Sequence, residues 1–456
     1  TSCLSDWSSD VCSSDLIRAV EGALSLPFDQ AMDNERALFN HLMADSQSAC
    51  LRHVFFAERQ AAKVDGLPAD TPTLPIAKVG VIGAGTMGGG IAMNFLNAGL
   101  PVTIVETKQE ALDRGIAIIR KNYENTARKG KLTAEALEKR MGLLTGSLDM
   151  ADLGDCDLVI EAVFEQMDVK KDVFARLDKV AKPGAILATN TSYLDVDQIA
   201  AATSRPDHVL GLHFFSPANV MRLLEIVRTK DTTDPVLATA VKLARTIDKI
   251  GVVVGNGHGF VGNRILAARN AQADRLVLEG ASPADVDRIL YDFGFAMGHF
   301  RMRDLVGLDV GWNRATSASA NVREILNERG RHGQKSGGGY YDYDADRNAT
   351  LSPIAMQVIA DVAARDGITR RTVDDAEIRD RLLLSMVNEG AKILADGIAA
   401  RSSDIDIVWV TGYGWPKYRG GPMFWADLQG LPAIAARLRE LAAAHGDSLT
   451  PAPLLE

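Results

Sequence analysis

His213 and Glu225 are ionisable residues within two apolar stretches of the sequence, GLHFFSPANV and MRLLEIV. A buried imidazole or carboxylate is costly unless it has a partner, so we expect the two side chains to pair. An imidazole can accept the proton of a substrate hydroxyl while a carboxylate on its other ring nitrogen fixes the tautomer. A buried structural histidine beside a glutamate at a strand end is the alternative. The neighbouring motifs decide between these interpretations.

A glycine-rich motif with the spacing Gly83-x-Gly85-x-x-Gly88 follows the apolar stretch KVGVI and precedes a helical pattern. In a strand–turn–helix unit, the first glycine permits the tight turn and the second lets a pyrophosphate approach the backbone. The third lets the helix pack closely on the strand. The helix N-terminus offers free N–H groups to phosphates. The motif predicts a dinucleotide site, whereas an ordinary glycine-rich turn would not require the flanking strand and helix.

Glu106 stands at the end of the next apolar stretch, 23 residues after Gly83. A carboxylate at this position can accept hydrogen bonds from the ribose hydroxyls of a dinucleotide, and it repels a 2′-phosphate. The sequence therefore favours NAD over NADP, although Lys108 nearby weakens the repulsion.

Polar residues also follow a further apolar stretch and open a predicted helix. Asn190, Thr191 and Ser192 come after ILAT, and ligands gather at the carboxyl ends of parallel strands. A helix cap is the alternative. Asn263, in GHGFVGNRIL, begins a predicted helix. Its amide could donate to a substrate oxygen, or it could satisfy the backbone of its own helix.

Residues 120–132, RKNYENTARKGKL, carry five basic side chains. A solvated helix face is one interpretation of this segment. Contact with the phosphates of a substrate is the other.

The composition excludes several classes of protein. The chain has 456 residues and a net charge of −9, which argues against a general nucleic-acid-binding protein. No apolar run reaches the roughly 18 residues of a membrane span. The four cysteines form no CxxC pair, so we expect no metal site and a reducing compartment. The sequence shows neither a signal peptide nor a C-terminal peroxisomal tripeptide, so we expect a cytoplasmic location.

Seven apolar stretches alternate with helical patterns between residues 78 and 254 and predict a mostly parallel sheet with helices on both faces. The predicted strands are 78–82, 102–106, 158–161, 185–188, 209–214, 223–228 and 252–254. Beyond residue 255, two blocks of helical pattern each include a loop rich in glycine and tyrosine. The fold class is α/β: a Rossmann-type doubly wound sheet domain, followed by two duplicated all-α domains.

These patterns divide the chain into five parts. A Ser/Asp-rich leader, unrelated or disordered, occupies residues 1–16, and a helical segment with a proline-rich linker occupies 17–75. The nucleotide-binding domain is 76–255, and the two helical domains are 256–345 and 346–456.

Several motifs in this order resemble the L-3-hydroxyacyl-CoA dehydrogenase family over about residues 17–456. They are VIGAGTMGGGIA, IEAVFEQMDVKKDVF, TNTSYL, GLHFFSPANVMRLLEIV and GFVGNR. The similarity is greatest to the dehydrogenase portion of multifunctional fatty-acid β-oxidation enzymes. Residues 17–65 resemble the segment that follows an enoyl-CoA hydratase domain in those enzymes, so we expect this chain to lack that domain.

The resemblance implies NAD-dependent oxidation of L-3-hydroxyacyl-CoA to 3-ketoacyl-CoA. It gives catalytic-site roles to His213, Glu225, Ser192 and Asn263. It gives cofactor contacts to Gly83, Gly85, Met87, Gly88, Glu106, Glu165, Lys170, Asn190 and Ser216. Ser216 stands where the family commonly has asparagine, which leaves one nicotinamide contact open.

The implied partners are an acyl-CoA substrate and either a second copy of the chain or a thiolase subunit. Two other functions stay open. One is an NAD-dependent oxidoreductase of another 3-hydroxyacid, and the other is an inactive NAD-binding fragment.

Overall fold

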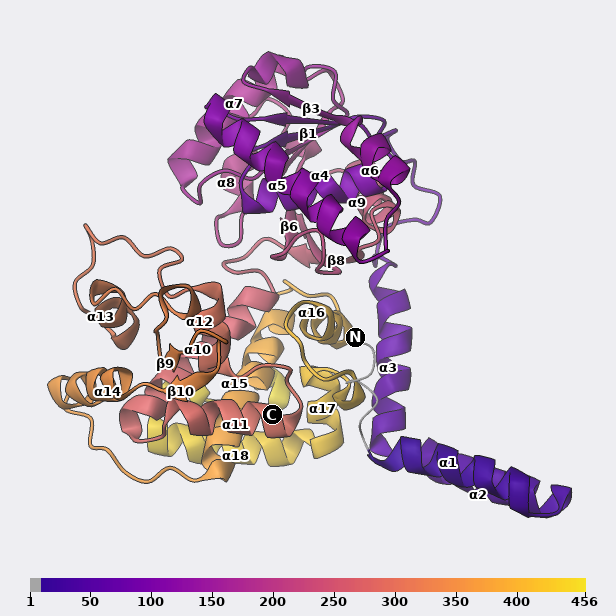
Figure 1. Ribbon diagram of the computed structural model, residues 1–456, viewed down its shortest axis with the longest axis vertical. Helices are drawn as coiled ribbons and strands as arrows, with labels where there is room; N and C mark the ends of the chain where they lie inside the picture. Colours follow the sequence, from indigo (N-terminus) through magenta and orange to yellow (C-terminus); the bar gives the residue numbers. More distant parts are fainter. Residues whose placement is uncertain (1–9) are drawn as a thin grey trace. The chain divides into compact units, whose positions relative to one another are not determined.

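The computed structural model describes residues 10–456, which form two compact units (Figure 1). The first unit contains the described chain up to Asn263 together with residues 393–413 and 417–428. The second contains residues 264–392, 414–416 and 429–456. Residues 1–9 of the expected leader lie outside the described residues, and residues 10–16 belong to the first helix. The predicted boundary at residue 345 between two helical domains does not coincide with a boundary between these units. The two helical domains stay a prediction.

The first unit contains one eight-stranded sheet within the described chain, in the order β3-β2-β1-β4-β5-β6-β7-β8. Every neighbouring pair is parallel except β6 and β7, which are antiparallel. The predicted doubly wound, mostly parallel sheet is confirmed. The strands are β1 (Val79–Ile82), β2 (Val102–Val105), β3 (Leu144–Ser147), β4 (Leu158–Glu161), β5 (Ile186–Thr189), β6 (Val209–Phe214), β7 (Leu223–Arg228) and β8 (Ile250–Gly255).

Strand β3 was not predicted from the sequence. Its four residues, LTGS, contain one large apolar side chain, and the two middle residues are exposed at the edge of the sheet. An edge strand of this kind has no apolar run, because it does not need to be buried on both faces.

Helices cover both faces of the sheet. Side chains from α4, α5, α6 and α9 form one core with the strands, and side chains from α7 and α8 form a second core on the other face. In α5 the buried residues Leu112, Ile119 and Tyr123 follow the helical period, which explains the helix. The helices are α4 (Thr86–Asn97), α5 (Gln109–Arg128), α6 (Ala134–Met141), α7 (Met167–Val180), α8 (Val196–Ala200) and α9 (Asp234–Thr246).

Three helices precede the sheet, and the sequence predicted a helical segment in this part of the chain without dividing it. They are α1 (Asp10–Ser25), α2 (Phe28–Ala44) and α3 (Ser46–Ala61), of which α1 and α2 pair as a hairpin (Figure 1). Helix α3 packs against α16 (Ser402–Gly412), which belongs to the same unit as α17 (Pro422–Gln429).

A partly buried contact between His53 and Asp406 helps to hold α3 in place. His53 Nε2 lies 2.8 Å from Asp406 Oδ2, and the His53 ring stacks on Phe424. Burial raises the pKa of Asp406 to about 6, although the hydrogen bond from His53 acts against this rise. The backbone N–H of Met423 also donates to Asp406. The position of α3 is therefore fixed within its unit by specific polar contacts.

The second unit is mainly helical. Helix α11 (Pro283–Phe293) begins after Ser282-Pro283, a pair typical of a helix start, and Ser282 and Asp285 form a capping box. The stretch after residue 332, predicted as a loop, contains a short antiparallel hairpin of β9 (Tyr341–Tyr343) and β10 (Ala349–Leu351). The other helices are α10 (Gly262–Glu279), α11 (Pro283–Phe293), α12 (His299–Val306), α13 (Val322–Glu328), α14 (Pro353–Arg365), α15 (Asp375–Ala395) and α18 (Leu431–His445). No helix among residues 10–456 is long and apolar enough to cross a membrane.

Candidate active site

The antiparallel pairing of β6 and β7 places His213 directly opposite Glu225. His213 Nδ1 lies 2.7 Å from Glu225 Oε2. The Glu225 side chain is fully buried, and its other oxygen accepts hydrogen bonds from the backbone N–H groups of Val261 and Gly262. Because Nδ1 faces the carboxylate, Nε2 is the ring nitrogen left to exchange a proton with a substrate.

Aromatic rings enclose this pair. Phe215 and Phe260 have ring centroids 4.4 Å and 5.6 Å from that of His213. Tyr413 lies 5.5 Å from Phe215, edge to face. The rings limit the access of water to the imidazole, which strengthens its electrostatic interaction with Glu225.

Tyr413 also fixes the amide of Asn263. The Tyr413 hydroxyl donates to Asn263 Oδ1 at 2.8 Å, and Asn263 Nδ2 points to the carbonyl oxygen of Ser192 at 3.5 Å. A Cβ atom on Gly262 would lie 2.2 Å from the Tyr413 ring, so only glycine leaves room for this tyrosine. Sequence reasoning missed Tyr413; the glycine- and aromatic-rich stretch GYGWP was its only signal.

Glu165 holds the loop that carries Ser192. Its Oε1 accepts hydrogen bonds from Thr191 Oγ1 at 2.6 Å and from the N–H groups of Ser192 and Tyr193 at 2.7 and 3.0 Å. Burial acts to raise the pKa of Glu165, but the hydrogen bond from Thr191, the charge of Lys170 and these N–H groups outweigh it and lower the pKa. The carboxylate is therefore charged and fixes the backbone on both sides of Ser192.

Lys170 lies behind Glu165 and is only 1% exposed. Its Nζ is 2.6 Å from Glu161 Oε1 and 3.5 Å from Glu165 Oε2. Glu161 ends strand β4, is fully buried and accepts a hydrogen bond from Thr189 Oγ1 at 2.7 Å. The ammonium group is thus enclosed by two carboxylates. Sequence reasoning missed Glu161, whose signal was an acidic residue at the end of an apolar strand.

Asn190 joins the ends of two neighbouring strands. Its Oδ1 accepts a hydrogen bond from the backbone N–H of Phe214 at 2.8 Å, directly after His213. The cap of α8 is Asp195, which accepts from Asp197 N, so the helix-cap interpretation of Asn190, Thr191 and Ser192 is wrong.

The glycine-rich turn has the geometry that a dinucleotide requires. Gly83 has φ +102°. A Cβ atom on Gly88 would lie 1.8 Å from the carbonyl oxygen of Gly83, so only glycine fits at residue 88. A Cβ atom on Gly85, the cap residue of α4, would meet nothing within 4 Å. The turn is closed on the side of the helix and open at Gly85, where a pyrophosphate approaches.

Glu106 braces this turn, since its Oε1 accepts a hydrogen bond from Ala84 N at 3.0 Å and its Oε2 accepts one from Thr107 N at 2.9 Å. Met87 is half-buried against the core, and Ser216 is exposed in the segment after β6. The open turn, the free N-terminus of α4 and the acidic residue together fit NAD.

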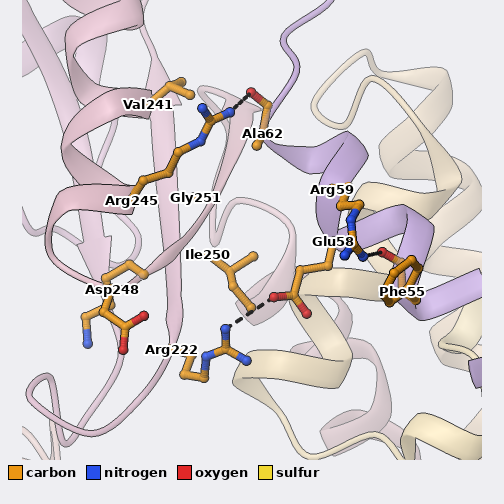
Figure 2. Close-up of a pocket in the computed structure, with 11 residues that line it drawn as sticks. Phe55, Glu58, Arg59, Ala62, Arg222, Val241, Arg245, Asp248, Ile250 and Gly251 are labelled. Atoms are coloured by element: carbon orange, nitrogen blue, oxygen red, sulfur yellow. Dashed lines mark hydrogen bonds and ion pairs between the residues drawn. The ribbon is translucent and has the colours of Figure 1, made fainter.

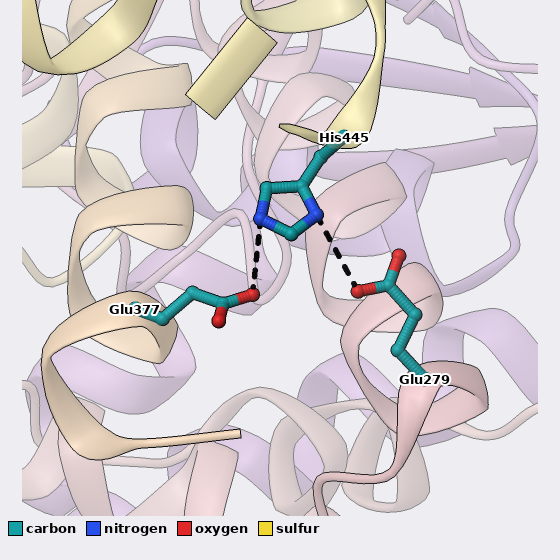
Figure 3. A group of neighbouring side chains, drawn as sticks. All are labelled: Glu279, Glu377 and His445. Carbon is teal, nitrogen blue, oxygen red and sulfur yellow. Dashed lines mark ion pairs between the residues drawn. The ribbon is translucent and has the colours of Figure 1, made fainter. Parts of the chain in front are cut away.

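The second unit contains a different group of ionisable residues, Glu279, Glu377 and His445, with ligand atoms close enough to suggest a metal site. The two nitrogens of His445 face different carboxylates: Nδ1 lies 3.7 Å from Glu279 and Nε2 lies 3.3 Å from Glu377 (Figure 3). Opposite ring nitrogens cannot bind the same ion, which argues against a metal centre.

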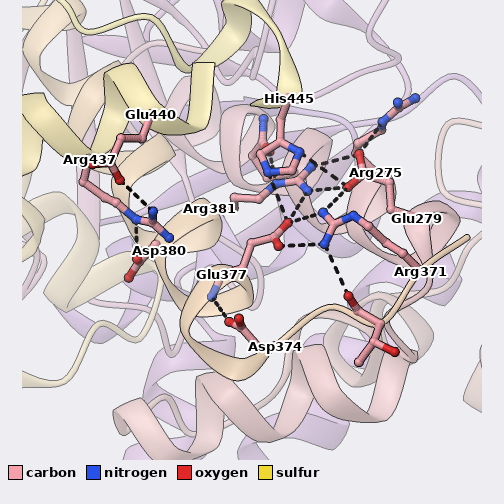
Figure 4. A network of polar contacts seen from close by, with 12 residues as sticks. Arg275, Glu279, Arg371, Asp374, Glu377, Asp380, Arg381, Arg437, Glu440 and His445 are labelled. Atoms are coloured by element: carbon pink, nitrogen blue, oxygen red, sulfur yellow. Dashed lines mark hydrogen bonds and ion pairs between the residues drawn. The ribbon is translucent and has the colours of Figure 1, made fainter. Parts of the chain in front are cut away.

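Three arginines already neutralise this group (Figure 4). Arg381 is fully buried and lies 2.6 Å from Glu279 and 3.1 Å from Glu377. Arg275 binds Glu279, and Arg371 binds both carboxylates. The charges favour an ion-pair network that joins α10, α15 and α18.

Two family models match the chain. Residues 78–257 match the NAD-binding domain of 3-hydroxyacyl-CoA dehydrogenase, and residues 259–343 match the C-terminal domain of the same enzyme.

The peroxisomal bifunctional enzyme of Homo sapiens is 41% identical over 450 residues, which are 93% of this chain and 62% of that protein. The chain therefore spans less than two thirds of the length of this relative.

Two solved structures are also similar. The 3-hydroxybutyryl-CoA dehydrogenase of Escherichia coli K12 has a TM-score of 0.72 and 29% identity, covering 84% of this chain and 98% of that one. The dehydrogenase part of multifunctional enzyme 1 from C. elegans has a TM-score of 0.64 and 31% identity, covering 88% of this chain and 96% of that one. The chain belongs to the 3-hydroxyacyl-CoA dehydrogenase family.

Proposed function

We propose that this protein oxidises L-3-hydroxyacyl-CoA to 3-ketoacyl-CoA with NAD as the oxidant, as a step of fatty-acid β-oxidation. The observation that carries the proposal is the buried contact of His213 with Glu225 in the unit that contains the NAD-binding turn. The names of the human and E. coli relatives support the substrate class.

In the proposed reaction, His213 Nε2 accepts the proton of the 3-hydroxyl group as the C3–H bond breaks. Bound NAD supplies the acceptor for the hydride from C3. Glu225 stabilises the imidazolium that forms, and the N–H groups of Val261 and Gly262 keep this carboxylate in position. In the reverse direction His213 returns the proton to the carbonyl oxygen.

Ser192 and Asn263 are the proposed contacts to the substrate oxygen and the nicotinamide side of the site. Glu165 orients the Ser192 loop, and Tyr413 orients the Asn263 amide so that Oδ1 is occupied and Nδ2 is the donor. Glu165, Asn190 and Ser216 remain the proposed residues on the nicotinamide side. Because Lys170 is buried between two carboxylates, we assign it to holding Glu165.

The acyl-CoA substrate and any protein partner are part of this proposal. The basic segment 120–132 is a candidate for contact with the phosphates of CoA, although Arg120 forms an exposed ion pair with Glu138. A second copy of the chain or a thiolase subunit is the proposed partner. A cytoplasmic location also stays a prediction, and the human and rice relatives are named as peroxisomal proteins.

The test is NADH formation by the purified chain with NAD and L-3-hydroxybutyryl-CoA, followed by a longer-chain substrate and the matching free 3-hydroxyacid. Turnover of either CoA thioester, with little turnover of the free acid, supports the proposal. Faster turnover of the free acid would favour an oxidoreductase of another 3-hydroxyacid. No turnover of any substrate, with NAD still bound, would favour an inactive NAD-binding fragment.

A further inference from the structure

A cavity of about 550 Å³ lies in the first unit between α3 and the segments that flank β8 (Figure 2). Helix α3 contributes Glu58 and Arg59 to its wall, α9 contributes Arg245, and Arg222 stands directly before β7. This volume suits a small organic ligand. The residues of the proposed active site do not line it.

The cavity wall is positively charged. Four cationic side chains, Arg59, Arg222, Arg245 and Lys249, face two acidic ones, Glu58 and Asp248, which leaves a net charge of plus two. An excess of arginine in a cavity favours anionic ligands, because the planar guanidinium group donates two parallel hydrogen bonds to a phosphate.

Most of these cations have no ion-pair partner among the described residues. Arg222 pairs with Glu58 at 3.2 Å, whereas Arg245 donates to the carbonyl oxygen of Ala62 at 3.0 Å. Arg59 donates to the carbonyl oxygen of Phe55 and lies over the Phe55 ring (Figure 2). A guanidinium that donates to a single carbonyl oxygen keeps further N–H groups for a ligand.

Lys249 connects the cavity to the loop between β6 and β7. It is buried, and its Nζ donates to the carbonyl oxygens of Ala218 and Met221 at 2.7 and 2.6 Å. Burial lowers the pKa of Lys249 to about 8, with Arg222 acting in the same direction and Asp248 against it. Asn94 of α4 donates to the same Ala218 oxygen. The cavity therefore touches the loop that joins His213 to Glu225.

The rest of the wall is apolar. Phe55, Val241 and Ile250 line the cavity beside the charged groups. A ligand that is only an inorganic ion would leave this surface uncovered, whereas a phosphate ester with an organic group would cover it. The charges and the apolar wall together suit a nucleotide-like molecule.

We propose that this cavity is a second anion site, which binds the diphosphate group of a small organic molecule and is separate from the NAD-binding turn. Arg222 and Arg245 bind the phosphate oxygens, and Phe55 covers the organic group. The class includes free nucleoside diphosphates and CoA itself, both of which carry a diphosphate.

Isothermal titration calorimetry of the full chain, with the NAD-binding turn saturated by NADH, tests this proposal. The probes are inorganic diphosphate, ADP and CoA. The double variant Arg222→Gln/Arg245→Gln should bind at least one organic probe about tenfold more weakly or worse, which corresponds to about 1.4 kcal/mol or more. Both side chains are exposed, so the variant should fold, and thermal melting checks this.

Lys242→Gln is the matched control, because Lys242 lies on the same helix as Arg245 but does not line the cavity. This variant should bind the probes as the wild type does. Weaker binding of ADP or of CoA by the double variant identifies the source of the diphosphate group. Absence of binding, or equal affinity of the double variant and the wild type, would overturn the proposal. NADH binding is measured separately, so failure of the cofactor assignment is distinguishable.

Discussion

Lys170 and Arg381 are both buried cations held between two glutamates, but their surroundings differ. Around Lys170, the carboxylates of Glu161 and Glu165 also accept hydrogen bonds from backbone N–H and hydroxyl groups of neighbouring segments. Around Arg381, Glu279 and Glu377 bind further arginines and a histidine. The group around Lys170 holds the Ser192 loop in position through Glu165, and the group around Arg381 joins helices to one another.

The residue types in a cluster of acidic and basic side chains therefore do not show whether the cluster supports activity or stability. The Lys170 group has one cation for two carboxylates, and backbone N–H groups supply the missing positive charge. The Arg381 group has three guanidinium groups for two carboxylates, so no negative charge remains for a metal ion. We expect substitutions in the first group to change activity, and those in the second to change stability.

The largest expected effect is the loss of turnover on substitution of His213, which pairs with Glu225 in the proposed active site. His213→Ala should lower turnover by about 10²–10⁴-fold, the contribution of general acid–base catalysis, because no other base replaces Nε2. NADH formation under saturating substrate measures this effect, and NAD binding should be unchanged. Turnover within about threefold of the wild type would remove His213 from its proposed role.

Arg381→Ala should lower the free energy of unfolding by about 3 kcal/mol, since the buried Glu279 loses its fully buried partner while Arg275 and Arg371 remain. Urea unfolding measures the loss. Activity per folded molecule should stay at the wild-type level. A large fall in that activity would contradict the assignment of the Arg381 group to stability alone. Arg379→Ala, an exposed arginine on the same helix, is the control.

Glu161→Gln should lower turnover by as much as about 10²-fold, because Lys170 would then draw Glu165 away from the Ser192 loop. The loss of stability should be smaller, about 1–3 kcal/mol. Steady-state kinetics with varied NAD measure the first effect. Lys171→Gln, an exposed neighbour of Lys170, is the control and should behave as the wild type does. Equal kinetics of the two variants would contradict the positioning role.

The Arg381 group should also make stability depend on acid pH. The hydrogen bond from Arg371 lowers the pKa of Glu377 from 4.5 to about 2, with Arg381 adding to the shift against burial. The folded state therefore binds this proton less readily than the unfolded state, and its stabilising effect is lost as pH falls from 4.5 towards 2. Between pH 4.5 and 3.5 the loss is on the order of 1 kcal/mol.

Urea unfolding at several pH values, compared between the wild type and Glu377→Gln, isolates this contribution. The variant should have the flatter profile in the acid range. Identical slopes for the two proteins would show that Glu377 is not the group responsible.

The smallest expected effect is that of added metal. Zinc at a modest excess should leave the melting temperature of the chain unchanged, because the arginines around Glu279 and Glu377 oppose a further positive charge. Differential scanning calorimetry with and without a chelator measures this. Stabilisation by zinc that disappears in His445→Gln would instead make the group a metal site.

The sequence predicted those parts of the fold whose causes are local. Strands β4, β6 and β7 were predicted with the bounds that the structure has, because each is a continuous apolar run in a buried sheet. The pairing of His213 with Glu225 across β6 and β7 also joins residues close in the sequence, since only a short loop separates the two strands.

The rest of the site depends on contacts between distant segments. Tyr413 reaches Asn263 across 150 residues, and no spacing in the sequence encodes such a contact. Lys170 was predicted to contact the cofactor, but whether an ammonium group is exposed or enclosed depends on the fold around it. Glu161 was missed because its carboxylate faces the protein interior.

The reversal of direction between β6 and β7 has a consequence for folding. His213 and Glu225 are twelve residues apart in the chain, so the loop that brings them together is short and its closure costs little conformational entropy. The contact between Tyr413 and Asn263 closes a loop of 150 residues and must wait for the remote segment to dock. The acid–base pair can therefore form early in folding, and the amide that completes the site becomes ordered last.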